Sequence, residues 1–134
     1  MNKSICFGIA NEKTMLPIIR QFFNDETIEK TTFVRCPFDY EGSGILYELK
    51  TRRCNYRKYP DTIFPMSKFN YQPEKEKVLI FSFTDGNYYI KYNPLVFETF
   101  KKENKQYRFD RGYLDKPAEY INIPIDKLIK MENA

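Results

Sequence analysis

The 134-residue sequence contains no histidine. This absence excludes zinc sites with histidine ligands, Ser-His-Asp and Cys-His catalysis, and nucleases that use histidine as the general base. Tryptophan is absent too, so the aromatic content of 17% consists of 11 tyrosines and 12 phenylalanines. About half of the rings therefore carry a hydroxyl group, which needs a hydrogen-bond partner wherever the ring is buried.

Cysteine is scarce, and the three cysteines, Cys6, Cys36 and Cys54, are odd in number and lack the spacing of a zinc site. The sequence shows no signal peptide, so we expect reduced thiols in an intracellular protein of the cytoplasm, or of the host cell cytoplasm if the protein is viral, and not a secreted protein. No apolar run approaches the roughly 20 residues that span a bilayer, so no membrane partner is expected.

The length predicts a single domain over residues 1–134. Hydrophobic periodicity and turn signals predict a helix at about 15–24, with Glu12 on the turn before it, and a short helix at 95–102. Strands are predicted at 31–39, 45–53, 78–83, 88–92 and 118–124, an irregular segment at 52–72 and a closing helical turn at 125–131. Helices interleaved with strands indicate an α/β fold with a mixed β-sheet flanked by helices.

An acidic residue followed two positions later by lysine occurs twice, in Glu48-Leu49-Lys50 and Glu103-Asn104-Lys105. Roughly two such tripeptides are expected by chance in this composition, so the pattern alone carries no information. The context separates them, because Glu48-Leu49-Lys50 lies within a predicted strand and the other lies in a charged stretch.

A turn at Glu41–Gly44 predicts that Tyr40 pairs with Ile45 and Asp39 with Leu46. Asp39 then shares a sheet face with Glu48 and Lys50, and its Cα lies about 7–8 Å from that of Glu48 across the diagonal. A slip of one residue would place Asp39 on the opposite face.

Two carboxylates at this separation, Asp39 and Glu48, suit Mg²⁺ or Mn²⁺, and the Leu49 carbonyl is a further candidate ligand. Such a metal activates water and offsets phosphate charge, while Lys50 orients the water or stabilises the developing charge. The alternative interpretation is an exposed strand face with cross-strand ion pairs. For Glu12, a position in the metal shell competes with a simple helix-dipole role.

The net charge of +4 is too small to indicate nucleic-acid binding, but its distribution is uneven. Residues 49–60 contain no acid, and the stretch from residue 50 to 58 contains five cations: Lys50, Arg52, Arg53, Arg57 and Lys58. Cations bind phosphates and tyrosines stack on bases, so Tyr59 and the later Lys68 are further candidate contacts. The alternative is a solvated segment that favours solubility.

The positions Glu12, Asp39, Glu48 and Lys50 resemble the PD-(D/E)XK, or restriction-endonuclease-like, nuclease superfamily, and the stretch 47–68 is similar to small nuclease-like proteins of large DNA viruses and phages. Members have a helix that often bears a glutamate, a strand that ends in aspartate and a strand with (D/E)-x-K. One departure is Phe38, which separates Pro37 from Asp39.

The resemblance implies a restriction-endonuclease-like core and a magnesium-dependent DNA endonuclease, acting on duplex, branched or otherwise structured DNA. Several members are symmetric dimers, so a homodimer is a further expectation. Because some members keep the fold and lose cleavage, the alternative is an inactive nucleic-acid-binding or assembly module. A third hypothesis is a tyrosine-rich surface that binds another protein.

Overall fold

The computed structural model describes residues 3–32, 36–105 and 117–132. A six-stranded mixed sheet has the order β1 (Glu29–Lys30), β2 (Tyr40–Gly42), β3 (Ile45–Thr51), β5 (Glu76–Phe83), β6 (Gly86–Lys91) and β9 (Ile129–Lys130). A three-stranded antiparallel sheet has the order β4 (Asp61–Pro65), β8 (Ala118–Pro124) and β7 (Lys101–Lys105). The helices are α1 (Lys3–Phe22), α2 (Pro94–Phe97) and the 3₁₀ helices η1 (Met66–Asn70) and η2 (Ile125–Lys127). The expected α/β class with a mixed sheet is confirmed.

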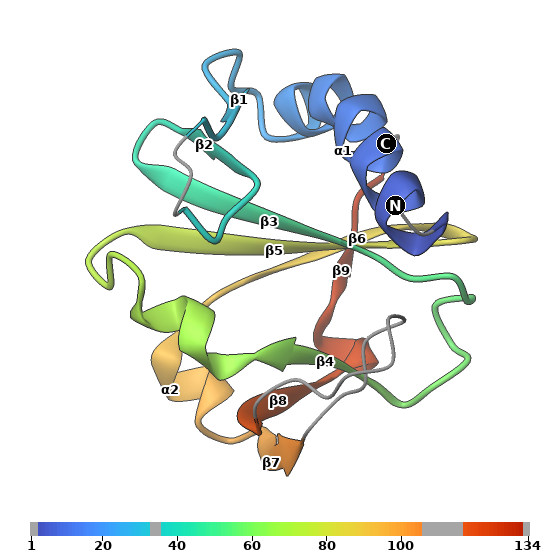
Figure 1. The fold of residues 1–134 in the computed structure, drawn as a ribbon, viewed down its shortest axis with the longest axis vertical. Coiled ribbons are helices and arrows are strands. Elements are labelled where there is room, and N and C mark those ends of the chain that lie inside the picture. Colours follow the sequence, from blue (N-terminus) through green and yellow to red (C-terminus); the bar gives the residue numbers. More distant parts are fainter. Residues whose placement is uncertain (1–2, 33–35, 106–116, 133–134) are drawn as a thin grey trace.

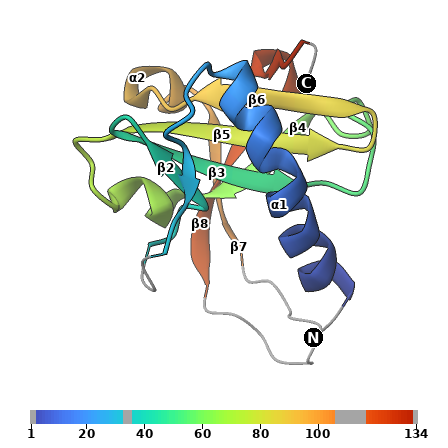
Figure 2. The same cartoon turned by 90° about the horizontal axis from the view of Figure 1, so that it is seen from above.

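The elements form three layers, with α1 on one face of the six-stranded sheet and the three-stranded sheet on the other (Figure 1). Seen from above, α1 crosses β3, β5 and β6 diagonally (Figure 2). The expectation that helices flank the sheet is therefore wrong for one face, which the second sheet covers. In the part of the chain that the structure describes, no helix combines the length and the apolar character needed to cross a membrane.

The parallel pair β3 and β5 lies at the centre, and its side chains alternate between two cores. Tyr47 and Leu49 pack towards Met15 and Ile19 of α1. Leu46, on the opposite face of β3, packs in the core that includes Phe64 of β4. Burial on both faces explains why β5 is an almost continuous apolar run.

Helix α1 is longer than predicted, since it begins at Lys3 rather than near residue 15, and Glu12 lies inside the helix. Pro17 is an interior residue of this helix and cannot donate the usual backbone hydrogen bond. The helix is held from outside instead, because Met15 and Ile19 are buried and the Tyr40 hydroxyl donates to the Glu12 carbonyl. Tertiary packing thus overrides the local cost of proline.

The predicted strand at 31–39 is wrong for its described residues, which lie between β1 and β2; residues 33–35 lie outside the described part. Thr31 instead contacts the residues that lead into β2, because its N–H donates to the Asp39 carbonyl (2.9 Å) and its hydroxyl to the Phe38 carbonyl (2.6 Å). Pro37 has no N–H for a ladder.

The β2–β3 hairpin has a two-residue turn, Ser43-Gly44, and not the predicted four-residue turn. Both turn residues have positive φ, 51° and 79°, as a type I′ turn requires. Tyr40 consequently pairs with Tyr47 instead of Ile45. The register differs from the prediction by two residues, and an even shift leaves every side chain on its predicted face.

In the second half of the chain, the hairpin of β5 and β6 and the strand at 118–124 are confirmed. The segment 52–72 contains β4 and the 3₁₀ helix η1, so the irregular assignment is partly wrong. Helix α2 ends at Phe97, and 101–105 forms β7 on the edge of β8. The predicted closing helical turn consists of η2 followed by β9; residues 106–116 lie outside the described part.

Gly42 lies against Ile28, and we expect Gly42→Ala to destabilise the protein by about 1–3 kcal/mol through overpacking. A Cβ at Gly42 would lie 2.8 Å from the Ile28 Cα, so the backbone itself must move. Gly44→Ala is the matched control, because it meets no atom within 4 Å and costs only the left-handed conformation, about 1 kcal/mol. Urea unfolding measures both, and equal midpoints would contradict the steric argument.

Candidate active site

The candidate site lies at the edge of β3 where β2 ends. The β2–β3 ladder stops at the Tyr40–Tyr47 pair, so the rest of β3 has no partner from β2. Asp39 fills this position: its N–H donates to the Tyr47 carbonyl (3.0 Å), and its Oδ2 accepts from the Leu49 N–H (2.8 Å). The hydrogen bond fixes the Asp39 carboxylate beside that of Glu48.

Glu12 reaches the same edge from α1. Asn11 Nδ2 donates to Thr51 Oγ1 at the end of β3 (2.9 Å), and the Tyr40 hydroxyl donates to the Glu12 carbonyl. These two contacts place the Glu12 carboxyl group within hydrogen-bonding reach of Asp39, while Lys30 Nζ forms an ion pair with Glu12 Oε2 (2.7 Å). The structure therefore brings together all three predicted acidic residues, Glu12, Asp39 and Glu48.

Burial and repulsion between carboxylates raise the pKa values of Asp39 and Glu12. The pKa of Asp39 rises from 3.8 to about 7, because of burial first and then the adjacent Glu48 carboxyl group. The hydrogen bond from the Leu49 N–H lowers this pKa but does not offset the rise. Burial also raises the pKa of Glu12, an effect that Lys30 opposes and Asp39 increases. The same acids add to burial in raising the pKa of the Tyr40 hydroxyl. The edge of β3 thus favours the uptake of positive charge.

Two lysines supply positive charge from the side of the second sheet. Lys68, on η1, forms an ion pair with Glu48, whose side chain is only 3% exposed. Lys50 follows Glu48 on the same face of β3, and the ammonium groups of Lys50 and Lys68 lie 5.9 and 5.7 Å from the centre of the Phe64 ring. Phe64 therefore supports both cations on an apolar surface.

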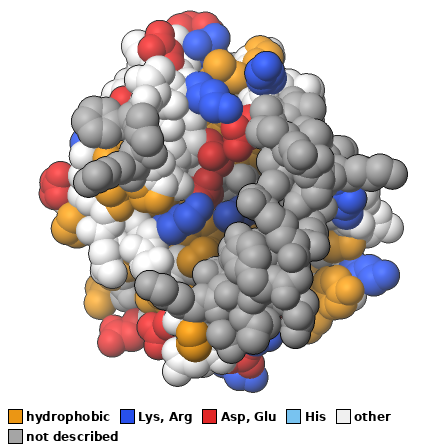
Figure 3. Space-filling model, viewed as in Figure 1, with side chains coloured by type: hydrophobic (Ala, Val, Ile, Leu, Met, Phe, Trp, Pro, Cys, Tyr) orange, Lys and Arg blue, Asp and Glu red, His pale blue; other side chains and the backbone are white. Residues whose placement is uncertain are grey.

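Burial is the main cause of the lowered pKa of Lys50, and the neighbouring Lys68 and Arg52 lower it further. The carboxylates of Glu48 and Asp39 raise this pKa and partly offset the effect. Figure 3 shows acidic side chains gathered in a hollow in the middle of this face, with lysine and arginine side chains beside them. A lysine with a lowered pKa beside carboxylates is suited to proton exchange with a bound water.

The donor chemistry fits a hard divalent cation. Within the described residues, no three acidic or cysteine side chains already surround one point as in a formed metal site. Asp39 and Glu48 supply carboxylate oxygens, however, and burial beside the Glu48 carboxyl group raises the pKa of Asp39, so a cation placed between them would be stabilised. The Leu49 N–H points to this edge, and the C=O of a strand residue points to the same side as its N–H, so the Leu49 carbonyl is a third oxygen there.

The predicted nucleic-acid-binding residues other than Lys68 divide into two groups. The Arg52 guanidinium donates to Thr62 Oγ1 (3.0 Å) and to the Ile63 carbonyl (2.8 Å), and it lies 5.5 Å from the Phe81 ring centre. This arginine ties the end of β3 to β4. The other four are exposed: Arg53, Arg57, Lys58 and Tyr59.

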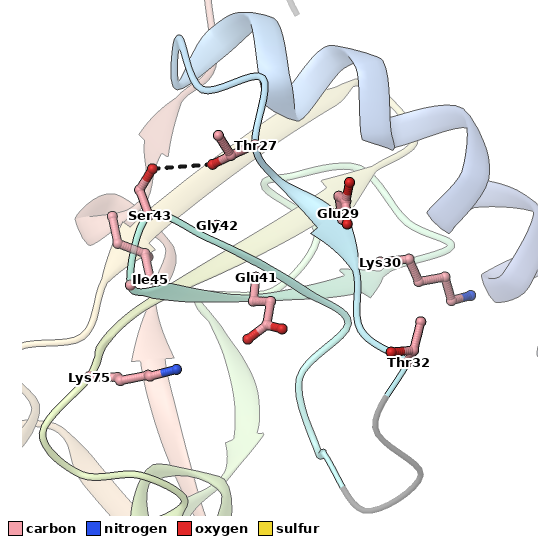
Figure 4. A pocket seen from close by; sticks show the side chains of 10 residues that line it. Thr27, Glu29, Lys30, Thr32, Glu41, Gly42, Ser43, Ile45 and Lys75 are labelled. Atoms are coloured by element: carbon pink, nitrogen blue, oxygen red, sulfur yellow. Dashed lines mark hydrogen bonds between the residues drawn. The ribbon is translucent and has the colours of Figure 1, made fainter.

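A cavity of about 290 Å³ lies at the turn end of the β2–β3 hairpin (Figure 4). Glu29 and Glu41 line it together with Lys30 and Lys75, and a hydrogen bond joins the hydroxyls of Thr27 and Ser43 (3.2 Å). The opposite charges balance, so this cavity favours no ligand of either sign.

Sequence reasoning missed several residues that shape the site. Asn11 and Lys30 carry no local signal, because each acts across a long separation in the chain. Tyr40 had one available signal, since a buried tyrosine next to Asp39 needs a partner for its hydroxyl. Phe64 had none, because β4 itself was not predicted.

Comparison of the chain with protein-family models, with curated proteins and with solved structures finds no match. The functional argument therefore depends on the geometry of the site.

Proposed function

We propose that the chain is a metal-dependent DNA endonuclease with a restriction-endonuclease-like core, of the PD-(D/E)XK superfamily, that hydrolyses phosphodiester bonds of branched or otherwise structured DNA. The main support is that Asp39, Glu48 and Lys50 meet at one edge of β3, with Glu12 reaching the same point from α1. A glutamate-bearing helix, an aspartate before a strand pair and a Glu-x-Lys strand also follow one another in the order that the superfamily uses.

Asp39, Glu48 and the Leu49 carbonyl would hold Mg²⁺ or Mn²⁺. When bound, this metal lowers the pKa of a water and offsets the charge that develops on the phosphate. Lys50 orients the attacking water, and burial, which lowers the pKa of its ammonium group, favours its part in proton transfer. Glu12 positions Asp39 and gives the shell a further carboxylate.

The DNA backbone would bind along the exposed cations Arg53, Arg57 and Lys58, beyond the Lys50 end of β3. Arg52 would act by holding β4 in place. The two described cysteines, Cys36 and Cys54, are free thiols, which accords with an intracellular protein. A homodimer would let two such sites cut both strands.

The decisive experiment is cleavage of supercoiled and four-way-junction DNA by the purified protein with Mg²⁺ or Mn²⁺. We expect cleavage that EDTA abolishes and that falls to background in Glu48→Gln, because amides bind divalent cations poorly. Glu103→Gln is the matched control, since Glu103 belongs to the other acidic-x-lysine tripeptide and forms ion pairs with Lys101 and Lys105 on β7. Equal cleavage by both variants would overturn the site assignment.

The second candidate function is a nucleic-acid-binding or assembly module that keeps the fold without cleavage. The ion pair between Lys68 and Glu48 favours it, because an ammonium group already neutralises the buried carboxylate. This alternative predicts salt-sensitive DNA binding that neither EDTA nor Glu48→Gln changes.

A further inference from the structure

A cavity of about 710 Å³, larger than the one at the β2–β3 turn, lies beyond the Lys50 end of β3. Its lining is mainly apolar with some polar groups and includes Arg52, Tyr56, Tyr59, Ile63, Phe83 and Ile125. This size and this lining are typical of sites that enclose a flat organic group. Neither the metal chemistry nor the carboxylates of the candidate active site involve this cavity.

The wall of the cavity is held in place by contacts within the protein. The Tyr56 ring stacks on Tyr88, with ring centres 3.9 Å apart, and the Tyr56 hydroxyl donates to the Ile125 carbonyl (2.5 Å). The Tyr56 N–H donates to Asp85 Oδ1 (2.8 Å). The cavity is therefore a formed feature that a ligand can enter without reorganising its wall.

Tyr59 at the edge of the cavity is 57% exposed and is free to stack on a ligand. Lys58 Nζ lies 6.0 Å from the centre of its ring. Arg53, Arg57 and Lys58 are exposed in the same segment, whereas Asp61 is the one acidic residue among the described lining residues. An exposed ring among cations, next to an apolar cavity, is the arrangement that binds a base together with its phosphates.

The position of Arg52 connects the cavity with the candidate active site. Arg52 lies two residues beyond Lys50, just after the end of β3, and its N–H donates to the Ser82 carbonyl of β5 (2.8 Å), so the chain still runs along the sheet at this point. Its guanidinium group lines the cavity and holds Thr62 and Ile63, which also line it. A nucleic-acid strand with a phosphate at Lys50 therefore brings a neighbouring nucleotide to the mouth of the cavity.

We propose that this cavity accepts one unstacked nucleobase of a bound DNA strand, with Tyr59 as the stacking platform. The inference rests on the proposed function for the course of the strand, and it specifies the substrate as DNA with an unpaired nucleotide close to the reacting phosphate. Duplex DNA supplies such a base only after unstacking, while branched or single-stranded DNA presents it directly.

The test compares two end-labelled 12-mers in EDTA, where no cleavage occurs: oligothymidine and a chain of the same length built of abasic sugar-phosphate. Fluorescence anisotropy gives both dissociation constants for the wild type, Tyr59→Ala, Tyr59→Phe and the control Leu95→Ala, which alters an exposed residue of α2. We expect the wild type to prefer the chain with bases by about fivefold to a hundredfold, as stacking of one base on an aromatic ring provides.

Tyr59→Ala is expected to remove most of this preference while its affinity for the abasic chain stays unchanged, and Tyr59→Phe is expected to restore it. Thermal unfolding checks that each variant is folded. Equal affinity of the wild type for both chains, equal losses for both chains in Tyr59→Ala, or no binding to either chain would overturn the inference. Cleavage of junction DNA is measured separately, so a failure of this inference with intact metal-dependent cleavage is distinguishable from a failure of the proposed function.

Discussion

Asp39→Asn is expected to stabilise the metal-free protein at pH 8 and, in the same molecule, to abolish DNA cleavage. The carboxylate of Asp39 lies beside that of Glu48 and is largely withdrawn from water. Asparagine removes the charge and keeps an oxygen that accepts from the Leu49 N–H. Cleavage is lost because an amide is a poor ligand for Mg²⁺, and we expect a fall of about a thousandfold or more, in line with the loss of several kcal/mol of charge stabilisation.

The pH dependence of this stabilisation follows from the raised pKa of Asp39. The folded protein holds the proton up to a pKa of about 7, whereas the unfolded chain releases it near 3.8. The folded state therefore binds more protons between these two values, and the free energy of unfolding of the wild type falls as the pH rises through this window. The whole difference corresponds to at most about 4 kcal/mol, and we expect about 2 kcal/mol because local relaxation softens buried charges.

Chemical unfolding of the metal-free proteins at pH 4, 6 and 8 measures this effect. The advantage of Asp39→Asn is expected to be small at pH 4 and largest at pH 8. Asp25→Asn is the matched control of opposite sign, since hydrogen bonds from Thr27 and Ser43 lower the pKa of Asp25. Its substitution is expected to lower stability at pH 8. If Asp39→Asn gave no gain in the free energy of unfolding at pH 8, burial and the adjacent Glu48 carboxylate would not destabilise the charged form of Asp39.

The sequence predicted the central hairpin well, for a reason that concerns parity. The turn prediction was wrong by two residues, but a strand has a period of two, so Asp39 still meets Glu48. Local alternation therefore sufficed to place Asp39 and Glu48 together. It could not place Glu12 inside a helix, because Pro17 argues locally for a later helix start and the packing of α1 on the sheet decides otherwise.

The second sheet was not predictable in the same way. Strand β4 follows Pro60, ends at Pro65 and is stabilised by pairing with β8, which is distant in the sequence. The position of Lys68 depends on that unpredicted strand, because η1 follows β4 directly and places the Lys68 ammonium group over Phe64 and beside Glu48. Local patterns predicted a surface lysine that contacts phosphate, and the long-range pairing instead places its ammonium group on a buried carboxylate.

Lys68→Met is expected to lower the stability of the metal-free protein and to raise its affinity for Mn²⁺. The Lys68 ammonium group compensates the charge of the Glu48 carboxylate, whose side chain is only 3% exposed. Removal of this ammonium group therefore leaves a buried carboxylate without its ion-pair partner. We expect a loss of about 3 kcal/mol at pH 8, the lower end of the range for breaking a buried pair, because Lys68 itself is partly exposed.

The gain in metal affinity has the same origin. In the wild type a divalent cation must displace the Lys68 ammonium group from Glu48, whereas in Lys68→Met the carboxylate is already free. We expect Mn²⁺ to bind about tenfold more tightly, which corresponds to 1.4 kcal/mol, and to raise the midpoint of thermal unfolding more in the variant than in the wild type.

Isothermal titration with Mn²⁺ and thermal unfolding with and without Mn²⁺ check both effects, with Lys102→Met as the control for loss of one exposed cation. Glu48→Gln combined with Lys68→Met separates the effect on stability from the effect on Mn²⁺ binding. The double variant leaves no unpaired buried charge, so it is expected to recover stability without binding Mn²⁺. If Lys68→Met left the affinity for Mn²⁺ unchanged, Lys68 would not occupy the position of the metal. The ion pair would then be the resting arrangement of a fold without metal chemistry, as the non-catalytic alternative requires.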